Sequence, residues 1–271
     1  MMETNKEIQV LIPTFNRMQA LTVTLTSLYY QSEESFDIVI SDQSAINDVE
    51  ADPIVQTICR MLEMKGHSVS ILKNLPRRGM AQQRQFLLEQ SRAPYSLFLD
   101  DDLVLEPYVL KDLKQSLHKL QCGFVGAAVI GLSYRDDYRP HQQQIEFWEH
   151  EVEPETIIPQ GTKWHRYNLH NAANILHIQQ QYNASPDNPR PYKVAWVGGC
   201  VMYETKKLLS SGGFQFWKEL PEQHCGEDVL AQLRVMKTFG GCGIIPSGVY
   251  HQEIATSIAD RKVNAPEFLE I

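Results

Sequence analysis

Short apolar runs alternate with longer stretches of helical spacing through the first hundred residues. The apolar runs have the length of buried strands and end at polar or proline-containing turns; they occupy residues 7–12, 36–41, 68–72 and 95–99. The stretches between them place apolar residues three or four positions apart, as with Leu21, Leu25 and Leu28, which predicts helices; they occupy residues 17–30, 49–64 and 79–90.

Strand–helix alternation is typical of a largely parallel sheet with helices on both faces. In such sheets ligands bind at the carboxyl ends of the strands, near a switch in strand order. Thr14, Asp42 and the triplet Asp100–Asp102 all follow predicted strand ends. We therefore expect an α/β fold whose binding site lies at this edge of the sheet.

The pattern changes after residue 103. Periodicity predicts helices at 104–120 and 226–241, and apolar runs predict strands at 123–132 and 194–203. The stretch 133–193 has no clear periodicity, and a segment of that length is usually functional or mobile.

The composition is that of a folded chain with an acidic balance. Hydrophobic residues make up 43% of the 271 residues, and the formal net charge is −8 without a dense stripe of Lys or Arg. Affinity for a phosphate backbone needs clustered cations, so the sequence argues against nucleic acid as a partner. An anionic small molecule would need a metal ion or a few local arginines to bind.

Cysteine usage and hydropathy bear on the compartment. The five cysteines are scattered without a C-x-x-C pair, which argues against a zinc knuckle or a disulfide framework and favours reduced thiols in the cytosol. The polar start at residues 1–6 lacks the apolar core of a secretory signal. No apolar run of the sequence approaches the roughly 20 residues that span a bilayer. We expect a cytoplasmic protein without a membrane span, and peripheral contact with the inner face of a membrane stays open.

The three adjacent carboxylates Asp100, Asp101 and Asp102 are the most informative feature. They repel one another, which costs stability unless a cation is present. In an extended segment Asp100 and Asp102 would point to the same side. One could then hold Mg²⁺ or Mn²⁺, which prefer oxygen ligands, while the other accepts a sugar hydroxyl. The alternative is a solvated acidic turn that caps the following helix.

Other polar residues in the first hundred have two readings each. Asp42 could accept a bond from a nucleotide base or ribose, or form an Asx-turn. Arg84 shares a helical face with apolar residues and needs an anionic partner, either a structural carboxylate or a substrate. Arg77 and Arg78 could reach a diphosphate or lie in a solvated loop.

Late in the chain, Glu227 and Asp228 open the predicted helix after Gly226. Acids in a first turn are favoured by the helix dipole alone. As a general base, Asp228 would need burial or a nearby carboxylate, because a helix N-terminus lowers the pKa of an acid. His251 could be a metal ligand through a neutral ring nitrogen or a merely packed side chain.

Six segments, in this order, resemble the family 2 glycosyltransferases with the GT-A fold, from residue 7 to about 251. The segments are LIPTFNR (11–17), VISDQS (39–44), GMAQQRQ (79–85), LFLDDD (97–102), WVGGCVMYETKKLLSSGGF (196–214) and GEDVLAQLR (226–234). Ser41 and Gln43 depart from a motif usually written with two acids, and Gln85 stands where Asn is usual. A lone D-x-D is a weak signal, but six motifs in sequence order are a strong one.

The resemblance implies a GT-A-type α/β fold, with a mostly parallel central sheet flanked by helices and a smaller acceptor-side sheet and loop region. The sequence has no internal repeat and no low-complexity linker, so we expect a single catalytic domain over residues 1–271. Residues 1–102 would bind the nucleotide-sugar, and residues 103–271 would bind the acceptor and carry the catalytic groups. Within the second half, residues 133–193 are the expected place for acceptor specificity.

The resemblance also assigns roles to matching residues. Those expected at the donor are Pro13, Thr14 and Asp42 at the base, Arg84 nearby, Arg78 and Asp101 among the cofactor-binding residues, and Asp100 at the ribose. Asp102 would bind Mn²⁺ or Mg²⁺ at the diphosphate, with His251 completing the site. Asp228 would be the base of an inverting transfer, supported by Glu227. A UDP-sugar is the default donor, and the acceptor would be a glycan, a lipid-linked molecule or a small molecule.

Two other classes compete with this interpretation. A nucleotidyltransferase normally carries a Gly-rich phosphate loop after its first strand, where this chain has IPTFNR. A non-catalytic protein that binds nucleotide-sugars or carbohydrates would have no need of Glu227 and Asp228. A metal-dependent phosphohydrolase is a minor third alternative. The oligomeric state is not indicated by the sequence.

Overall fold

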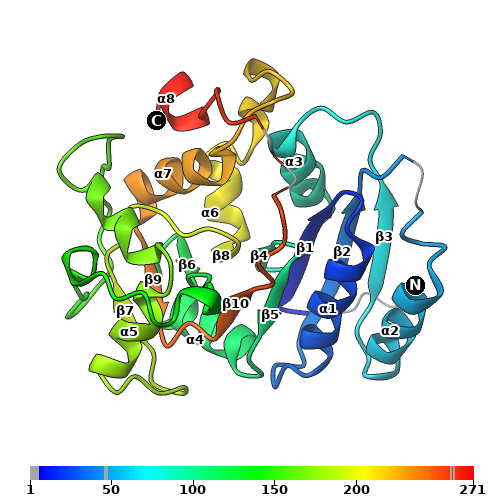
Figure 1. The fold of residues 1–271 in the computed structure, drawn as a ribbon. Coiled ribbons are helices and arrows are strands. Elements are labelled where there is room, and N and C mark those ends of the chain that lie inside the picture. Colours follow the sequence, from blue (N-terminus) through cyan, green and yellow to red (C-terminus); the bar gives the residue numbers. More distant parts are fainter. Residues whose placement is uncertain (1–5, 46–47, 257, 259) are drawn as a thin grey trace.

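A computed structural model describes residues 6–45, 48–256, 258 and 260–271. Its centre is an eight-stranded sheet made, in chain order, of β1 (Ile8–Thr14), β2 (Phe36–Asp42), β3 (Val69–Lys73), β4 (Tyr95–Leu99), β6 (Phe124–Gly126), β7 (Arg190–Tyr192), β8 (Cys200–Glu204) and β9 (Gly241–Ile245). In space the order is β3-β2-β1-β4-β8-β6-β9-β7, and β8 and β7 run opposite to the other strands (Figure 1). The sheet is mostly parallel, which confirms the predicted fold class.

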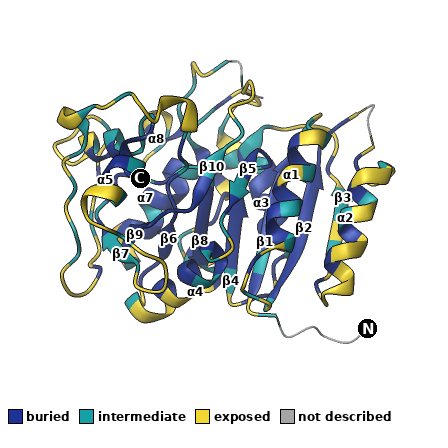
Figure 2. Cartoon of the chain, turned by 60° about the horizontal axis from the view of Figure 1, so that its bottom comes forward, coloured by how far each residue is buried: buried dark blue, intermediate teal, exposed yellow. Residues whose placement is uncertain are grey.

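Helices cover both faces of this sheet. They are α1 (Met18–Tyr29), α2 (Pro53–Met64), α3 (Met80–Gln90), α4 (Val109–Leu120), α5 (Asn174–Gln181), α6 (Thr205–Ser210), α7 (Glu227–Phe239) and α8 (Ala265–Phe268). Because side chains alternate along a strand, Val10 and Ile12 pack in one core with α1, α2 and α4, whereas Leu11 packs in the other with α3 and α7. Figure 2 shows the central strands buried between these layers and the outer side of α2 exposed.

The strand order reverses at β1, which lies between β2 and β4. Thr14 is the last residue of β1 and pairs with Asp42 at the end of β2. On the other side of β1, β4 ends at Leu99, just before the Asp triplet. The predicted switch point thus lies where Thr14 and the triplet come together.

The predicted helix at 104–120 is in part a strand. Residues Leu103–Leu105 form β5, which pairs antiparallel with β10 (Val249–His251), and α4 begins only at Val109. Three residues are too short for a pattern to separate strand from helix. In the register of this small sheet, His251 lies opposite Leu103, directly after the triplet.

The two later apolar runs are also shorter as strands than predicted. Within 123–132 only β6 is a strand, and within 194–203 the sheet begins at Cys200. Gly199 has a φ of +76°, a conformation that favours glycine, so the chain turns there before it enters β8.

The stretch 133–193 contains short helical turns as well as α5 and β7. The turns are η1 (Leu132–Tyr134), η2 (Pro140–Gln142) and η3 (Trp164–His170). Arg166, whose side chain is 5% exposed, lies 2.9 Å from Glu155 and 3.2 Å from Glu146. A buried guanidinium between two carboxylates therefore fixes this aperiodic stretch.

Within the described residues, no helix combines the length and the apolar character needed to cross a membrane. All five cysteines are free thiols. The polar stretch at residues 1–5 lies outside the described residues.

Candidate functional site

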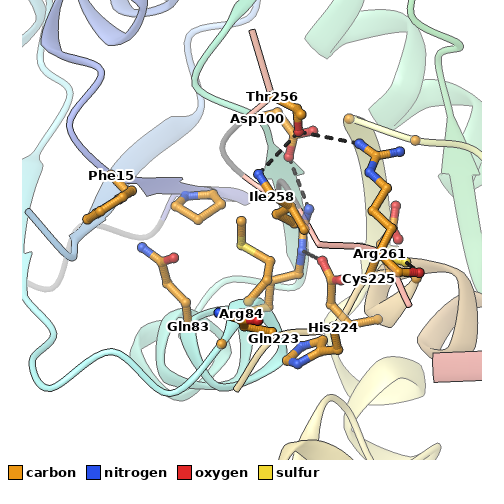
Figure 3. A pocket seen from close by; sticks show the side chains of 18 of the residues that line it. Phe15, Gln83, Arg84, Asp100, Gln223, His224, Cys225, Thr256, Ile258 and Arg261 are labelled. Atoms are coloured by element: carbon orange, nitrogen blue, oxygen red, sulfur yellow. Dashed lines mark hydrogen bonds and ion pairs between the residues drawn. The ribbon is translucent and has the colours of Figure 1, made fainter. Parts of the chain in front are cut away.

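A cavity of about 1030 Å³ lies at the carboxyl ends of β1 and β4. Its walls come from the loop after β1, the first turns of α3 and α7, the turn after β4 and the segment after β10. Figure 3 shows side chains from these elements pointing into one space, among them Phe15, Arg84, Asp100 and Arg261. The cavity lies where the sequence predicts the binding site.

The Asp triplet forms a turn between β4 and β5, not the extended segment that the sequence predicts. Asp101 Oδ2 accepts a hydrogen bond from Thr14 Oγ1 at 2.6 Å. Asp102 Oδ2 accepts one from Arg17 Nη1 at 2.8 Å and lies 3.5 Å from His251 Nε2. Because a turn does not follow the period of two, the carboxylates separate toward different partners.

Burial decides how these acids ionise. Burial and the neighbouring Asp102 charge raise the pKa of Asp101 to about 6, against the opposing hydrogen bond from Thr14. Burial also opposes ionisation of Asp102, but His251 and Arg17 hold the pKa of Asp102 below its usual range. The same contact raises the pKa of His251. Of Asp101 and Asp102, Asp102 is therefore the stronger acid.

Arg84 connects the turn after β4 with the first turn of α7. Its Nη2 lies 3.0 Å from Asp100 Oδ1, and its Nε lies 2.9 Å from Glu227 Oε1. The Arg84 side chain is only 6% exposed. Burial alone would lower the pKa of Arg84, but the two carboxylates raise it above the ordinary value. The structure shows the salt-bridge reading of Arg84, and the side chain also lines the cavity.

Asp228 lies in the first turn of α7 and lines the cavity. Its Oδ1 accepts a hydrogen bond from the Val229 amide at 2.9 Å. Burial and the neighbouring Glu227 raise the pKa of Asp228 to about 7, while Arg84 acts in the opposite direction. Burial and the paired carboxylate thus outweigh the helix dipole. A carboxyl group that titrates near neutral pH is suited to accept a proton.

The chain reaches Asp228 through a glycine that the backbone requires. Gly226 has a φ of +74°, in the left-handed region. A Cβ on this residue would lie 2.2 Å from Asn264 Oδ1 and 3.0 Å from Pro266 Cδ. The close approach of the C-terminal segment therefore fixes where α7 begins.

Asp102 and His251 form the corner that fits a divalent cation best. No group of three or more His, Cys, Asp or Glu side chains in the described part of the chain is arranged to hold a metal. A carboxylate oxygen and an imidazole nitrogen suit Mn²⁺, whose remaining ligands would come from phosphate oxygens and water. His251 Nδ1 accepts a hydrogen bond from the Glu253 amide at 2.7 Å. Coordination through Nε2 would need the other tautomer, which gives up this bond.

Two predicted donor contacts do not line the cavity, although Pro13 and Thr14 do. Asp42 is fully buried; its Oδ2 lies 2.5 Å from Lys73 Nζ, and its Oδ1 accepts from the Ser44 amide at 2.8 Å. This is the Asx-turn reading of Asp42, and the adjacent Gln43 faces the cavity in its place.

Arg78 is exposed on the loop before α3 and does not line the cavity. The neighbouring Arg77 does, with its guanidinium carbon 3.6 Å from the ring centroid of Phe15. Of the two arginines weighed for a diphosphate contact, the structure therefore places Arg77 in the cavity.

A second, smaller cavity of about 240 Å³ adjoins the first and shares Asp100, Trp196 and His251 with it. Tyr167 from η3 contributes to its wall, and the rings of Tyr167 and Trp196 are parallel within 1° at 6.3 Å between centroids. His170 lies beside them, and burial lowers its pKa to about 4. Two aromatic side chains and a neutral imidazole therefore flank the acidic corner.

Two arginines of the cavity were missed by the sequence reasoning. Arg17 lies in the loop after β1, and a cation at a strand end beside three acids is a signal that could have identified it. Arg261 reaches the cavity from the aperiodic segment after β10, where its Nη2 lies 3.3 Å from Thr256 Oγ1 (Figure 3). That segment carries no periodic or motif signal that could have placed Arg261.

Comparisons with solved structures relate this arrangement to known folds. TarS 1-349 from S. aureus superposes with a TM-score of 0.56 at 18% identity, and the match covers 90% of this chain and 60% of that chain. TarS 1-349 in complex with UDP-GlcNAc gives 0.57 at 16%, over 93% and 60%. The mannosyltransferase PcManGT from Pyrobaculum calidifontis, in complex with GDP-Man and Mn²⁺, gives 0.58 at 13%, over 93% and 58%. At these identities the likeness concerns the fold, and the match covers about 60% of the length of these three chains and 36% of the longer TarS chain.

Sequence comparison identifies the family. No curated protein matches the sequence. A family model described as glycosyl transferase family 2 matches residues 9–183, which include the loop after β1 and the Asp triplet. The matched region is more than half of the chain, and the protein therefore belongs to glycosyl transferase family 2 and has a GT-A fold.

Proposed function

We propose that the chain is an inverting, metal-dependent glycosyltransferase that moves a sugar from a nucleotide-sugar to a hydroxyl group, with UDP as the default nucleotide. The observation that carries the proposal is the position of Asp228, which lines the same cavity as Asp102 and His251. A proton acceptor and an acidic corner suited to a cation thus lie on the walls of one cavity.

In this proposal the donor binds along the first half of the chain. Pro13 and Thr14 contact the nucleotide base. Asp100, whose Oδ1 is held by Arg84, accepts a hydrogen bond from a ribose hydroxyl. The corner of Asp102 and His251 takes Mn²⁺ or Mg²⁺, which when bound neutralises charge on the departing diphosphate. The complexes of TarS with UDP-GlcNAc and of PcManGT with GDP-Man and Mn²⁺ support this donor class.

Asp228 is the base in this proposal because Asp100, Asp101 and Glu227 beside it are engaged by other side chains. Asp100 and Glu227 are paired with Arg84, and Asp101 is held by Thr14 and Arg17. Among the described residues, no cation lies within salt-bridge distance of Asp228, and its pKa near 7 leaves it able to take a proton. It would remove the proton of the acceptor hydroxyl as this attacks the anomeric carbon from the face opposite the leaving group.

The second cavity is our candidate for the acceptor. A pyranose presents C–H groups on its faces, which pack against aromatic rings, and Tyr167 and Trp196 supply such rings beside Asp100. Residues 103–271 would thus bind a glycan, lipid-linked or small-molecule acceptor in polysaccharide synthesis. We infer a cytoplasmic setting from the free thiols, with contact at the membrane surface when the acceptor is lipid-linked.

Two variants test the proposal against a protein that only binds its ligand. Asp228→Asn should lower transfer at least about 100-fold, because general-base catalysis contributes about 10²–10⁴-fold, and should leave Mn²⁺-dependent donor binding intact. Asp102→Ala should remove the Mn²⁺-dependent part of donor binding. Binding is followed by the melting temperature with UDP-, GDP- and dTDP-sugars, with and without Mn²⁺.

Transfer by Asp228→Asn at the parent rate would disprove the base. Equal donor affinity of Asp102→Ala and the parent in Mn²⁺ would disprove the metal corner. Hydrolysis of the donor without an acceptor, at the rate of transfer, would favour a phosphohydrolase instead.

A further inference from the structure

Arg17 occupies the corner where a divalent cation would bind. It precedes α1, and its Nη1 lies 2.8 Å from Asp102 Oδ2 and 3.4 Å from Asp101 Oδ1. Its Nη2 donates to the carbonyl of Ala255 in the segment after β10. The side chain is 15% exposed. A largely buried guanidinium therefore acts as the counter-ion of the acidic turn.

The guanidinium and a divalent cation would need the same oxygen. Asp102 Oδ2, which Arg17 holds, is also the oxygen that faces His251 Nε2 at 3.5 Å. A cation held by these two atoms would need direct contact with both of them. Two positive groups on one carboxylate oxygen repel strongly where water is scarce. Binding of the cation therefore requires Arg17 to leave Asp102.

Arg17 can leave the acidic turn while Asp101 still has a hydrogen-bond partner. Asp101 keeps its hydrogen bond from Thr14 at 2.6 Å, which is shorter than its 3.4 Å contact with Arg17. Arg17 also lines the cavity, so its side chain is adjacent to the space where the proposed diphosphate would bind. Guanidinium groups bind phosphate through two parallel hydrogen bonds.

We propose that Arg17 competes with the divalent cation for Asp102 and turns to the donor diphosphate when the cation binds. The proposal rests on the proposed metal corner and adds a switch to it. Without nucleotide, the cation displaces Arg17 from Asp102, and the guanidinium finds no other anion to pair with. The affinity of the protein for the cation is therefore low. With nucleotide, the displaced guanidinium gains a phosphate partner. Cation and nucleotide therefore strengthen each other's binding by the same factor.

The first measurement is Mn²⁺ affinity without nucleotide, read from the free-Mn²⁺ electron paramagnetic resonance signal. Arg17→Gln should bind Mn²⁺ about tenfold more tightly than the parent, because the competitor is gone. Arg77→Gln is the matched control, since it removes a cavity cation that lies over Phe15 and not on a carboxylate. This control should change the affinity by less than about twofold. Equal effects of the two variants would reduce Arg17 to a general electrostatic influence and overturn the proposal.

The second measurement locates the competition. In an Asp102→Ala background, Arg17→Gln should no longer tighten Mn²⁺ binding, and a persisting tenfold gain would show that Asp102 is not the contested ligand. Arg17→Lys keeps the positive charge, so its Mn²⁺ affinity should rise less than that of Arg17→Gln. It replaces Arg17→Gln in the experiment if that variant does not fold. An equal rise in Mn²⁺ affinity for Arg17→Lys and Arg17→Gln would overturn the proposed competition.

The two proposals can fail separately. Parent protein that binds no Mn²⁺ even with UDP present would refute the metal corner itself. Parent protein that binds Mn²⁺ with UDP, together with an Arg17→Gln variant of unchanged Mn²⁺ affinity, would refute only the role of Arg17. With UDP added, the gain in Mn²⁺ affinity should be larger for the parent than for Arg17→Gln.

Discussion

Arg84 donates a hydrogen bond from Nε to Oε1 of Glu227 at 2.9 Å, and this bond joins α3 to the first turn of α7. The other end of the same guanidinium holds Asp100 at 3.0 Å. A single buried cation thus sets the spacing between the proposed donor side of the cavity and the turn that carries Asp228.

Removing the Arg84 charge should destabilise the fold. Arg84→Ala leaves Asp100 and Glu227 without their cation, and breaking a buried ion pair costs about 3–5 kcal/mol of unfolding free energy. Arg84→Lys should recover only part of this, since an ammonium group cannot reproduce the two-sided fork. Urea unfolding measures both variants, with the exposed Arg135→Ala as the control for loss of a surface charge. A loss below about 0.5 kcal/mol, the range of ordinary surface changes, would show that Arg84 does not hold the site together.

Transfer should depend on pH through Asp228. The proposed base works as the carboxylate, and burial with Glu227 raises its pKa to about 7. We therefore expect kcat/KM at saturating Mn²⁺ to rise about tenfold per pH unit below 7 and to level off above it. Donor binding by Asp228→Asn, measured over the same range, separates the base from titration of the donor site. A profile that is flat from pH 5.5 upward would contradict the assignment.

The sequence predicts the donor half better than the remainder of the chain. The alternation up to Leu99 is set by local apolar periodicity, so its strands and helices lie within a few residues of the prediction. The turn at Asp100–Asp102, the ion pair of Asp42 with Lys73 and the short strand β5 depend on partners far along the chain. Local pattern carries no information on such partners, and Lys73, Arg17 and β10 decide them.

The same reason explains which site residues could be foreseen. Asp228 and Arg84 stand in helical segments whose register the sequence sets, and both line the cavity. Arg261 and Thr256 come from an aperiodic segment that is held at the cavity by the pairing of β10 with β5 and by the bridge between Cys225 and Asn264. Their position depends on tertiary contacts, which local sequence patterns do not predict.

Asp228→Asn should stabilise the protein at alkaline pH. The pKa of Asp228 in the folded state, about 7, lies above its ordinary value of 3.8. Its contribution to stability is therefore complete below pH 4 and is lost as the pH rises through 7. After a discount for partial exposure, neutralising it should add roughly 2 kcal/mol at pH 8 and almost nothing at pH 4. Thermal unfolding at both pH values tests this, with the exposed Asp136→Asn as control; an equal gain at the two pH values would argue against a raised pKa.

Replacing Tyr167 should change the KM for the acceptor and not the KM for the donor. It lines only the smaller cavity, with its ring parallel to that of Trp196. Tyr167→Ala should raise the KM for acceptor about tenfold, which corresponds to the loss of about 1.4 kcal/mol. Tyr167→Phe keeps the ring and should stay close to the parent. Steady-state kinetics with each substrate varied in turn give the answer. A higher KM for the donor with an unchanged KM for the acceptor would place the acceptor elsewhere.

Gly226→Ala should shift the position of Asp228 although the Asp228 side chain itself is unchanged. The new Cβ would lie 2.2 Å from Asn264 Oδ1, and the φ of +74° disfavours any side chain. Backbone strain of this kind costs about 1–3 kcal/mol, so unfolding should begin at lower urea, and transfer should fall as the first turn of α7 shifts. Combining it with Asn264→Gly removes the oxygen but not the left-handed backbone. The double variant should therefore regain part of the stability relative to Gly226→Ala and still unfold before Asn264→Gly alone. Full recovery would mean that the contact with Asn264, and not the backbone conformation, is what requires a glycine before the base.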